Sequence, residues 1–366
     1  MKRIMRNKMR IMHVVPELKL AGAQIMVENL SSKLKGKGQE PIIVSLYNIN
    51  TPIVERLNSA GIKVYFLDKK SGFDPRAILR LRKLIKKEKP DIIHTHSYAL
   101  KYAYFAVKAT KYKRLVHTVH NLADRETTPI NLKLERKLFR KGKVQPVAIS
   151  PLIKESIMLF YDLGSDSVPM IFNGIPLDKC LVKKDYKEKN DRVRIIHIGR
   201  FQEQKNHEMI VRAMVDVCKK HPESKLSLFG EGELLDSVKK QVEELKIDSK
   251  IVFEGLTDDP YKELNSSDIF ILPSKWEGMP ITLIEAMASA MPCVVTAVGG
   301  VPDMVEDNIS GLISEIDESD LSEKICYLIE NEDVRKRLGE AALEKSKMFS
   351  SDEMCDKYID LYKRMM

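Results

Sequence analysis

Short apolar runs alternate along the 366-residue chain with longer stretches in which apolar residues recur every three or four positions. The first pattern is typical of a buried strand and the second of an amphipathic helix. The apolar runs predict six strands in each half of the chain, near residues 10–15, 40–47, 63–67, 91–97, 114–120, 144–150, 193–199, 225–230, 250–255, 269–273, 292–297 and 311–314. The clearest helical patterns lie at residues 22–35, 74–90, 206–221, 233–246, 260–267 and 280–290.

Strands that alternate with helices favour a parallel sheet covered by helices on both faces. Two such series predict an α/β protein with two doubly wound domains. In such domains ligands bind beyond the carboxyl ends of the strands.

The charged segment 171–192 separates the two series, because it has no strand pattern and begins with turn signals. We therefore expect one domain at residues 1–176 and a second at residues 177–348. An amphipathic pattern over residues 349–366 predicts a final helix, which should begin near Ser350 or Ser351.

The composition, 43% hydrophobic and 31% charged, is that of a soluble globular protein. No apolar run approaches the roughly 20 residues needed to span a bilayer. The basic stretch 1–15 has too short an apolar part for a signal peptide. The five cysteines lack a CxxC spacing, which favours a reducing cytoplasm and gives no zinc motif.

The charge is divided unevenly between the two halves. Residues 1–176 carry 33 Lys and Arg against 14 Asp and Glu, a net +19, whereas residues 177–366 carry 28 against 38, a net −10. A basic half can attract anionic lipid, nucleic acid or phosphorylated acceptors, and general solubility is the alternative explanation. No motif of interleaved aromatic and basic residues supports nucleic acid.

Two cations follow the first strand of the second half. That strand ends at Gly199, and Arg200 and Lys205 come next, at the start of a helix. Fixed positive charge beside helix N-terminal amides can bind a diphosphate and neutralise charge on a leaving phosphate. The alternative is a pair of surface cations on a loop.

Glycines mark other strand ends in this half, namely Gly230, Gly232, Gly255, Gly299 and Gly300. The GxG at 230–232 lacks the third glycine of a dinucleotide fingerprint, so it gives little support to NAD binding. Each glycine alone can simply form a turn. Together they indicate one crevice.

Two carboxylates, Glu277 and Glu285, lie eight residues apart where a loop joins a helix. Between them, Pro280 suits the first helical position. The backbone amides of Gly278, Met279 and Ile281 lie near a helix N-terminus, where they can bind hydroxyl or phosphate oxygens. Apolar neighbours predict that Glu285 is half-buried and needs a partner such as a ribose diol. The alternative is a solvated Glu285 and a Glu277 that only favours the helix dipole. Acid–base glycoside hydrolysis is a further possibility for two acids, but beside Arg200 and Lys205 they resemble two contacts to one ligand.

In the first half, Gly22 and Ala23 open a helix after a loop, where amides can again face a crevice. Four histidines lie at two strand ends: His94, His96, His117 and His120. Strand alternation places His94 and His96 on one face. Histidines here suit proton handling or hydroxyl binding. A structural role is the alternative, and no nearby Cys or Asp set supports a metal.

In this order the motifs HTH, TVHN, NGIP, GRFQEQKNHEMI, FGEGE and EGMPITLIE resemble glycosyltransferase family 4, the retaining GT-B enzymes. The resemblance covers essentially the whole chain, and Arg-x4-Lys followed by Glu-x7-Glu is its specific part. It implies two Rossmann-like domains facing a central cleft. The N-terminal domain would bind the acceptor and the second the nucleotide-sugar, with the C-terminal helix crossing back to the N-terminal domain. It also implies catalysis without a metal or other cofactor.

The resemblance implies a role for each matching residue. Arg200 and Lys205 would hold the donor diphosphate, Glu285 the ribose, and Glu277 with the amides after it the sugar. His120 would lie near the reaction centre. The donor site would also include Gly199, Gly230 and Gly255, and the acceptor loop Gly22, Ala23 and His96.

Two positions depart from the family pattern. Ala21 stands where the first loop has a second glycine, which changes the expected loop conformation and acceptor fit. Asp303, one methylene shorter, stands where the family has an acid after the Gly-Gly-x-Pro turn, and we assign it no catalytic role.

We therefore expect a cytoplasmic enzyme, peripheral at the inner face of the cell membrane, that moves a hexose from a UDP-linked donor to a lipid-linked glycan in capsule or exopolysaccharide synthesis. The basic domain would face the anionic membrane surface. The alternatives are a nucleotide-sugar hydrolase or epimerase on the same fold, and a non-catalytic nucleotide-sugar-binding partner subunit.

Overall fold

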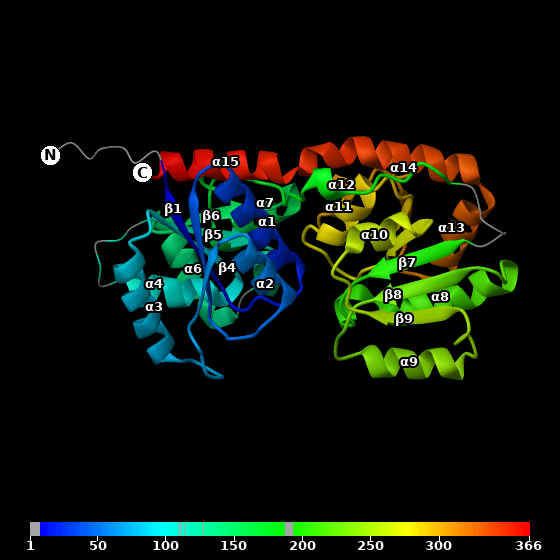
Figure 1. Ribbon diagram of the computed structural model, residues 1–366, viewed down its shortest axis with the longest axis horizontal. Coiled ribbons are helices and arrows are strands. Elements are labelled where there is room, and N and C mark those ends of the chain that lie inside the picture. Colours follow the sequence, from blue (N-terminus) through cyan, green and yellow to red (C-terminus); the bar gives the residue numbers. More distant parts are fainter. Residues whose placement is uncertain (1–7, 109, 111, 113, 127, 187–192) are drawn as a thin grey trace. The chain divides into compact units, whose positions relative to one another are not determined.

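The computed structural model describes residues 8–366 except 109, 111, 113, 127 and 187–192 (Figure 1). The start of the basic N-terminal stretch and the end of the charged segment 171–192 therefore lie outside the described residues. The contacts within the chain form two compact units. Unit 1 contains the residues up to Gly174 together with Ser351–Met366, and unit 2 contains Ile175–Ser350.

Unit 1 is built on a parallel sheet of six strands in the order β3-β2-β1-β4-β5-β6. The strands are β1 Arg10–Val15, β2 Glu40–Ser45, β3 Lys63–Phe66, β4 Ile92–His96, β5 Leu115–Val119 and β6 Gln145–Ala148. Its helices are α1 Gly22–Gly36, α2 Pro52–Ser59, α3 Pro75–Glu88, α4 Leu100–Val107, α5 Ala123–Glu126, α6 Pro129–Arg140, α7 Pro151–Tyr161 and α15 Ser351–Arg364. The strand order reverses between β1 and β4, which is where a doubly wound sheet binds its ligand.

Unit 2 repeats this topology with the order β12-β11-β10-β7-β8-β9, again all parallel. The strands are β7 Arg194–Ile198, β8 Lys225–Phe229, β9 Ile251–Gly255, β10 Ile269–Leu272, β11 Cys293–Thr296 and β12 Leu312–Ser314. The helices are α8 His207–Lys220, α9 Leu235–Glu244, α10 Pro260–Asn265, α11 Ile281–Ala288, α12 Val301–Met304, α13 Glu318–Glu330 and α14 Glu332–Ser346. Here the order reverses between β7 and β10.

The twelve predicted strands and two doubly wound sheets are confirmed. Near-continuous apolar strands such as Ile269–Leu272 are buried because helices cover both faces of the sheet. The predicted final helix is also confirmed: α15 packs beside α1 in unit 1, as the red and blue ribbons in Figure 1 show. Its Tyr358 and Tyr362 are fully buried in the core of that unit.

None of the helices in the described part of the chain is both long enough and apolar enough to cross a membrane.

Candidate functional site

The loops after β7 and β10 meet at the switch point of unit 2. The backbone N–H of Lys275 donates to the carbonyl of Gln204 at 2.8 Å, and the side-chain amide of Gln204 donates to the carbonyl of Trp276 at 2.9 Å. These contacts bring together Lys205 and Glu277, which are 72 positions apart in the sequence.

The carboxylate of Glu277 is only 4% exposed and accepts three hydrogen bonds. They come from Lys205 Nζ at 2.5 Å, Ser274 Oγ at 2.7 Å and Gln204 Nε2 at 3.2 Å. A buried carboxylate needs such donors to stay charged. Sequence reasoning found Glu277 and Lys205 but missed Gln204 and Ser274, whose polar side chains on the same two loops were the available signal.

Arg200 lies on the same loop as Lys205 but in a different environment. Its side chain is exposed, and within the described residues its guanidinium has no hydrogen-bond or ion-pair partner. The loop therefore offers one cation that is already paired and one that is available for an anion.

The strand-end glycines of unit 2 allow one backbone to approach another. A Cβ on Gly230, which has φ +140, would lie 2.1 Å from the carbonyl oxygen of Gly199. A Cβ on Gly299, with φ +58, would lie 1.6 Å from the carbonyl oxygen of Glu277. The N–H of Gly300 donates to the carbonyl of Gly278 at 3.1 Å. The turn after β11 is thus packed directly on the loop that carries Glu277. Gly255, with φ +74 and open space around it, fits the simpler reading of a turn residue.

Helix α11 begins at Ile281, one residue later than the sequence predicted. Pro280 caps the helix in an extended conformation, with φ −70 and ψ 118, so it is not the first helical residue. The first turn of this eight-residue helix, which follows the loop of Glu277 and Gly278, has backbone N–H groups without intrahelical acceptors.

Glu285 is buried, with 3% of its surface exposed, so the prediction of a half-buried side chain was wrong. The reason is that α11 is buried on every face, with α10 and α14 packed against it. Burial raises the pKa of Glu285 to about 8. The small exposed fraction is against the alternative of a solvated acid, and among the described residues no donor is hydrogen-bonded to the carboxyl group, which leaves it available to a ligand.

In unit 1, three histidine rings form a hydrogen-bonded row across β1, β4 and the end of β5. His13 Nδ1 lies 3.2 Å from His96 Nε2, and His96 Nδ1 lies 3.0 Å from His120 Nε2. The prediction that His94 and His96 share a face is confirmed, since their ring centroids are 4.3 Å apart. Sequence reasoning missed His13, although its strand was predicted correctly.

The neighbouring His94 is held by hydroxyl groups. Its Nδ1 lies 2.7 Å from Tyr362 Oη, and its Nε2 lies 2.7 Å from Thr118 Oγ1. One ring nitrogen each of His13, His94 and His96 lies within 4.8 Å of the others, a spacing within reach of a metal ion. Because both nitrogens of His94 already have hydroxyl partners, hydrogen bonding accounts for this ring.

In unit 1, His117 lies within a predicted strand and Gly22 lies at the start of a predicted helix. His117 is on the opposite face of β5 and contacts Thr95 Oγ1 at 2.9 Å, as a structural histidine does. Helix α1 begins at Gly22, and Ala21 caps it in an extended conformation with no side-chain cap. The carbonyl of Ala21 accepts from the N–H groups of Gln24 and Ile25. In the described part of the chain the N–H groups of Gly22 and Ala23 have no acceptor.

A cavity of about 990 Å³ in unit 1 lies at the opposite edge of the sheet. Its lining includes Asp91, Leu115 and Gln145, which stand at the amino ends of β4, β5 and β6. It is therefore not part of the site formed by His96, His120 and the start of α1.

Comparison with known proteins gives two family matches that together cover residues 20–345. Residues 20–179 match Glycosyltransferase Family 4, and residues 179–345 match Glycosyl transferases group 1. The chain is 28% identical over 263 residues to the UDP-Gal:alpha-D-GlcNAc-diphosphoundecaprenol alpha-1,3-galactosyltransferase of Escherichia coli, covering 68% of each protein.

Solved structures agree with these matches. A glycosyltransferase from Rickettsia africae ESF-5 is 26% identical, with a TM-score of 0.80 over 98% of this chain and 99% of that one. Anabaena HepE in complex with UDP-glucose is 16% identical, with a TM-score of 0.84 over 97% of this chain and 100% of that one, a likeness of fold.

Proposed function

The chain belongs to the glycosyltransferases of group 1 and family 4, with the GT-B fold, and we propose that it moves a hexose from a UDP-linked donor to a hydroxyl acceptor with retention. The observation that carries this proposal is the pairing of Lys205 with the buried Glu277 beside the exposed Arg200. Two cations and a carboxylate at a switch point suit a ligand that has a diphosphate at one end and hydroxyl groups at the other.

The chemical problem in this reaction is the charge that develops on the leaving nucleoside diphosphate. Arg200 would bind it through a planar fork, and Lys205 would supply a second positive charge. The first-turn amides of α11 add partial positive charge from the helix dipole. With the leaving group stabilised in this way, a phosphate oxygen of the donor can take the proton of the acceptor, so the protein needs no dedicated base and no metal.

The remaining donor contacts follow from burial and position. Glu277 and the backbone from Gly278 to Ile281 would hold the sugar hydroxyls. Glu285 would accept hydrogen bonds from the ribose diol, which would give this buried acid the partners that it lacks. Gly199, Gly230 and Gly255 would line the site as backbone, since they stand at the ends of β7, β8 and β9.

For the acceptor, we propose a lipid-linked glycan of the kind used in cell-surface polysaccharide synthesis. The Escherichia coli relative is named for an acceptor sugar on diphosphoundecaprenol, which is a lipid carrier. The open start of α1 at Gly22 and Ala23 would meet a phosphate of such an acceptor. His96 and His120 would border the same site, with His120 nearest the transferred sugar.

We propose that this acceptor is reached at the inner face of the cell membrane through one surface of unit 1, the α3 face. The exposed side chains of α3 beyond Pro75 include no carboxylate; they are Arg76, Leu79, Arg80, Lys83, Lys86 and Lys87. Phe73, just before the helix, and Leu79 are 62% and 60% exposed. Cations around exposed apolar groups suit an anionic lipid surface.

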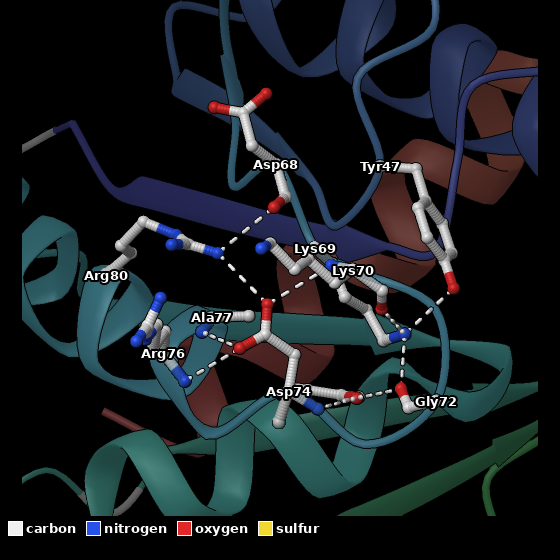
Figure 2. A network of polar contacts seen from close by, with 10 residues as sticks. Tyr47, Asp68, Lys69, Lys70, Gly72, Asp74, Arg76, Ala77 and Arg80 are labelled. Carbon is white, nitrogen blue, oxygen red and sulfur yellow. Dashed lines mark hydrogen bonds and ion pairs between the residues drawn. The ribbon is translucent and has the colours of Figure 1, made fainter.

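Hydrogen bonds hold the backbone on both sides of Phe73. Figure 2 shows the carboxylate of Asp74 accepting from the backbone of Arg76 and Ala77 and from the Arg80 guanidinium. The Lys69 ammonium donates to the Tyr47 hydroxyl at 2.8 Å and to the carbonyls of Lys70 and Gly72 at 2.8 and 2.7 Å (Figure 2). Because these polar groups are satisfied within the loop, Phe73 is left at the surface by a well-fixed backbone.

The test is product analysis with a panel of UDP-hexoses, with and without a lipid-linked acceptor sugar. We expect acceptor-dependent release of UDP and a product whose anomeric configuration, read by NMR coupling constants, matches that of the donor. Free hexose released equally without acceptor would indicate a hydrolase, and an interconverted donor sugar an epimerase. If no nucleotide-sugar is turned over while one binds, the chain would be a binding partner, and the proposal would be wrong.

A further inference from the structure

The histidine row His13–His96–His120 links a fully buried residue to one at the proposed acceptor site. His13 and His96 are 0% and 1% exposed, and His120 is half-buried. Both ends of the row carry a buried ring nitrogen without a partner in the described structure, Nε2 of His13 and Nδ1 of His120. The two inner contacts are N···N distances of 3.2 and 3.0 Å, each of which needs one hydrogen.

The three rings are neutral at physiological pH because they are buried. Burial lowers the pKa of His13 to about 3 and that of His120 to about 4. The pKa of His96 is lowered well below its usual value by burial and by the neighbouring histidines. A neutral imidazole has one N–H and one lone pair.

Because each neutral ring has one N–H and one lone pair, the tautomers of the three rings are coupled. His96 uses both nitrogens, so it must donate to one neighbour and accept from the other. If His96 donates from Nδ1 to His120, it must accept from His13, and all three rings carry hydrogen on Nδ1. If the direction is reversed, all three carry it on Nε2. Mixed sets would leave a contact with two hydrogens or with none.

The two directions differ in where they leave an unpaired N–H. The reversed direction places it on His13 Nε2, deep in the sheet, where no acceptor is present among the described residues. The other direction leaves only a lone pair there and places the N–H on His120 Nδ1, which is also buried in the ligand-free structure but belongs to a half-buried residue at the proposed acceptor site. A buried N–H group without a partner is rarer than a buried acceptor without one. The direction whose N–H a bound ligand can pair is therefore favoured.

We propose that His13 and His96 are positioning residues that hold His120 in the tautomer whose Nδ1 carries the hydrogen. This rests on the proposed function, in which His120 Nδ1 donates to a hydroxyl oxygen of the transferred sugar.

The groups packed around the three rings do not change this assignment of the tautomers. His94 is occupied by the hydroxyls of Tyr362 and Thr118, and Thr118 contacts Tyr358 Oη at 2.8 Å. Glu126 accepts from the backbone N–H of His120 at 2.5 Å, which fixes the residue without engaging its ring. His117 faces the other side of the sheet.

The test is the nitrogen spectrum of the full-length chain labelled with [15N]histidine, which contains only eight histidines. Ring nitrogens with and without hydrogen have well-separated shifts, and single substitutions assign the peaks. We expect Nδ1–H on His13, His96 and His120 alike. A mixed set, or three rings with hydrogen on Nε2, would overturn the proposal.

A pair of matched variants tests the coupling. In His13→Phe the row loses its inner donor, and we expect His120 to shift toward the Nε2–H tautomer. His117→Phe, also buried in the sheet but on its opposite face, should leave the His120 signals unchanged. Equal effects of the two variants would contradict a directed row. If His13→Phe does not fold, the wild-type spectrum alone decides.

Kinetics separate this inference from the function on which it rests. We expect His96→Asn to lower kcat about tenfold with little change in the KM of the donor, because binding is retained while the transition-state contact weakens. If the spectrum shows the predicted tautomers but kcat is unchanged, the row stands and the role of His120 in transfer is wrong.

Discussion

Lys205 Nζ lies 2.5 Å from Glu277 Oε1, so the residue proposed to bind the donor diphosphate is an ion-pair partner of the residue proposed to bind its sugar. Each side chain thereby holds the other in place before any ligand arrives. A site whose charged groups are already oriented has little reorganisation left to do during the reaction. The pair also ties together two loops that come from different strands of unit 2.

Removal of Lys205 should affect both stability and activity. In Lys205→Met the carboxylate of Glu277 stays buried without its cation, which should cost about 3 kcal/mol of unfolding free energy. Donor turnover should fall about 100-fold. Urea unfolding and UDP release measure the two effects.

The double variant Lys205→Met/Glu277→Gln is the control for the buried charge. It should regain part of the lost stability, because a neutral amide needs no cation, but it should regain no activity. An active single variant would contradict the proposed role of Lys205.

Arg200 should matter for donor binding and little for folding. Its exposed guanidinium has no partner in the described structure, so Arg200→Ala should change stability by less than about 0.5 kcal/mol. Its loss should lower donor turnover about 100-fold, since a charge contact to the leaving group disappears. Arg212→Ala, an exposed arginine of the same unit, should leave turnover unchanged. Similar losses in both variants would show a general charge effect.

Burial of Glu285 should make the protein less stable as the pH rises. Its folded pKa of about 8 exceeds the usual 4.5, so between these values the folded state binds more protons than the unfolded state. Its contribution to stability is thus fully present below pH 4.5 and is lost as the pH rises toward 8, by up to about 1.4 kcal/mol per pH unit. Glu285→Gln should remove this contribution, so the difference in unfolding free energy between wild type and variant should change from pH 5 to pH 8, measured by urea unfolding at pH 5, 6.5 and 8.

The exposed Glu243→Gln on α9 is the control for the charge change itself and should keep the wild-type slope. A Glu285→Gln protein that still loses stability in parallel with the wild type would show that Glu285 is ionised in the folded state.

The hydroxyl of Tyr362 should stabilise unit 1 through His94. Tyr362→Phe leaves the ring in place but deprives the buried His94 Nδ1 of its partner, which should cost about 1–3 kcal/mol. Tyr327→Phe on α13, at a 43% exposed tyrosine, should cost less than about 0.5 kcal/mol. Calorimetric Tm values compare the two. An unchanged Tm in Tyr362→Phe would mean that water replaces the hydroxyl.

Charge reversal on the α3 face should weaken membrane binding and spare catalysis. Lys83→Glu/Lys87→Glu should reduce co-sedimentation with phosphatidylglycerol vesicles at least about tenfold, since each lysine near the surface contributes about 1 kcal/mol. The same change at the exposed Lys219 and Lys240 of unit 2 is the control. Turnover of a water-soluble acceptor should be unaffected. Binding that ignores anionic lipid, salt or the reversed charges would contradict the proposed surface.

The fold was predictable from the sequence because its strands are nearly continuous apolar runs. Runs such as Ile269–Leu272 are buried on both faces, and this pattern is local. The start of α11 was missed by one residue because proline fixes φ but not ψ, and the ψ of 118 at Pro280 makes this residue the cap. The burial of Glu285 depends on α14, which lies about 50 positions further along the chain and has no local signature.

The site was predictable only in part, for a similar reason. The residue types and order identified Arg200, Lys205 and Glu277 as one group. The contacts of Gln204 and Ser274 with Glu277 could not be foreseen, because they arise where two loops meet. The position of His13 on β1 became meaningful only once β1 was placed beside β4, where His13 is in register with His94.

Helix α15 has a consequence for how the protein is made. Residues 351–366 emerge from the ribosome after the whole of unit 2, yet their tyrosines complete the core of unit 1. At about 5–20 residues per second, unit 1 waits roughly ten to thirty seconds with its histidine-bearing face uncovered. The part of the chain that is synthesised first is thus the last to close, and during that interval nascent-chain chaperones have access to it.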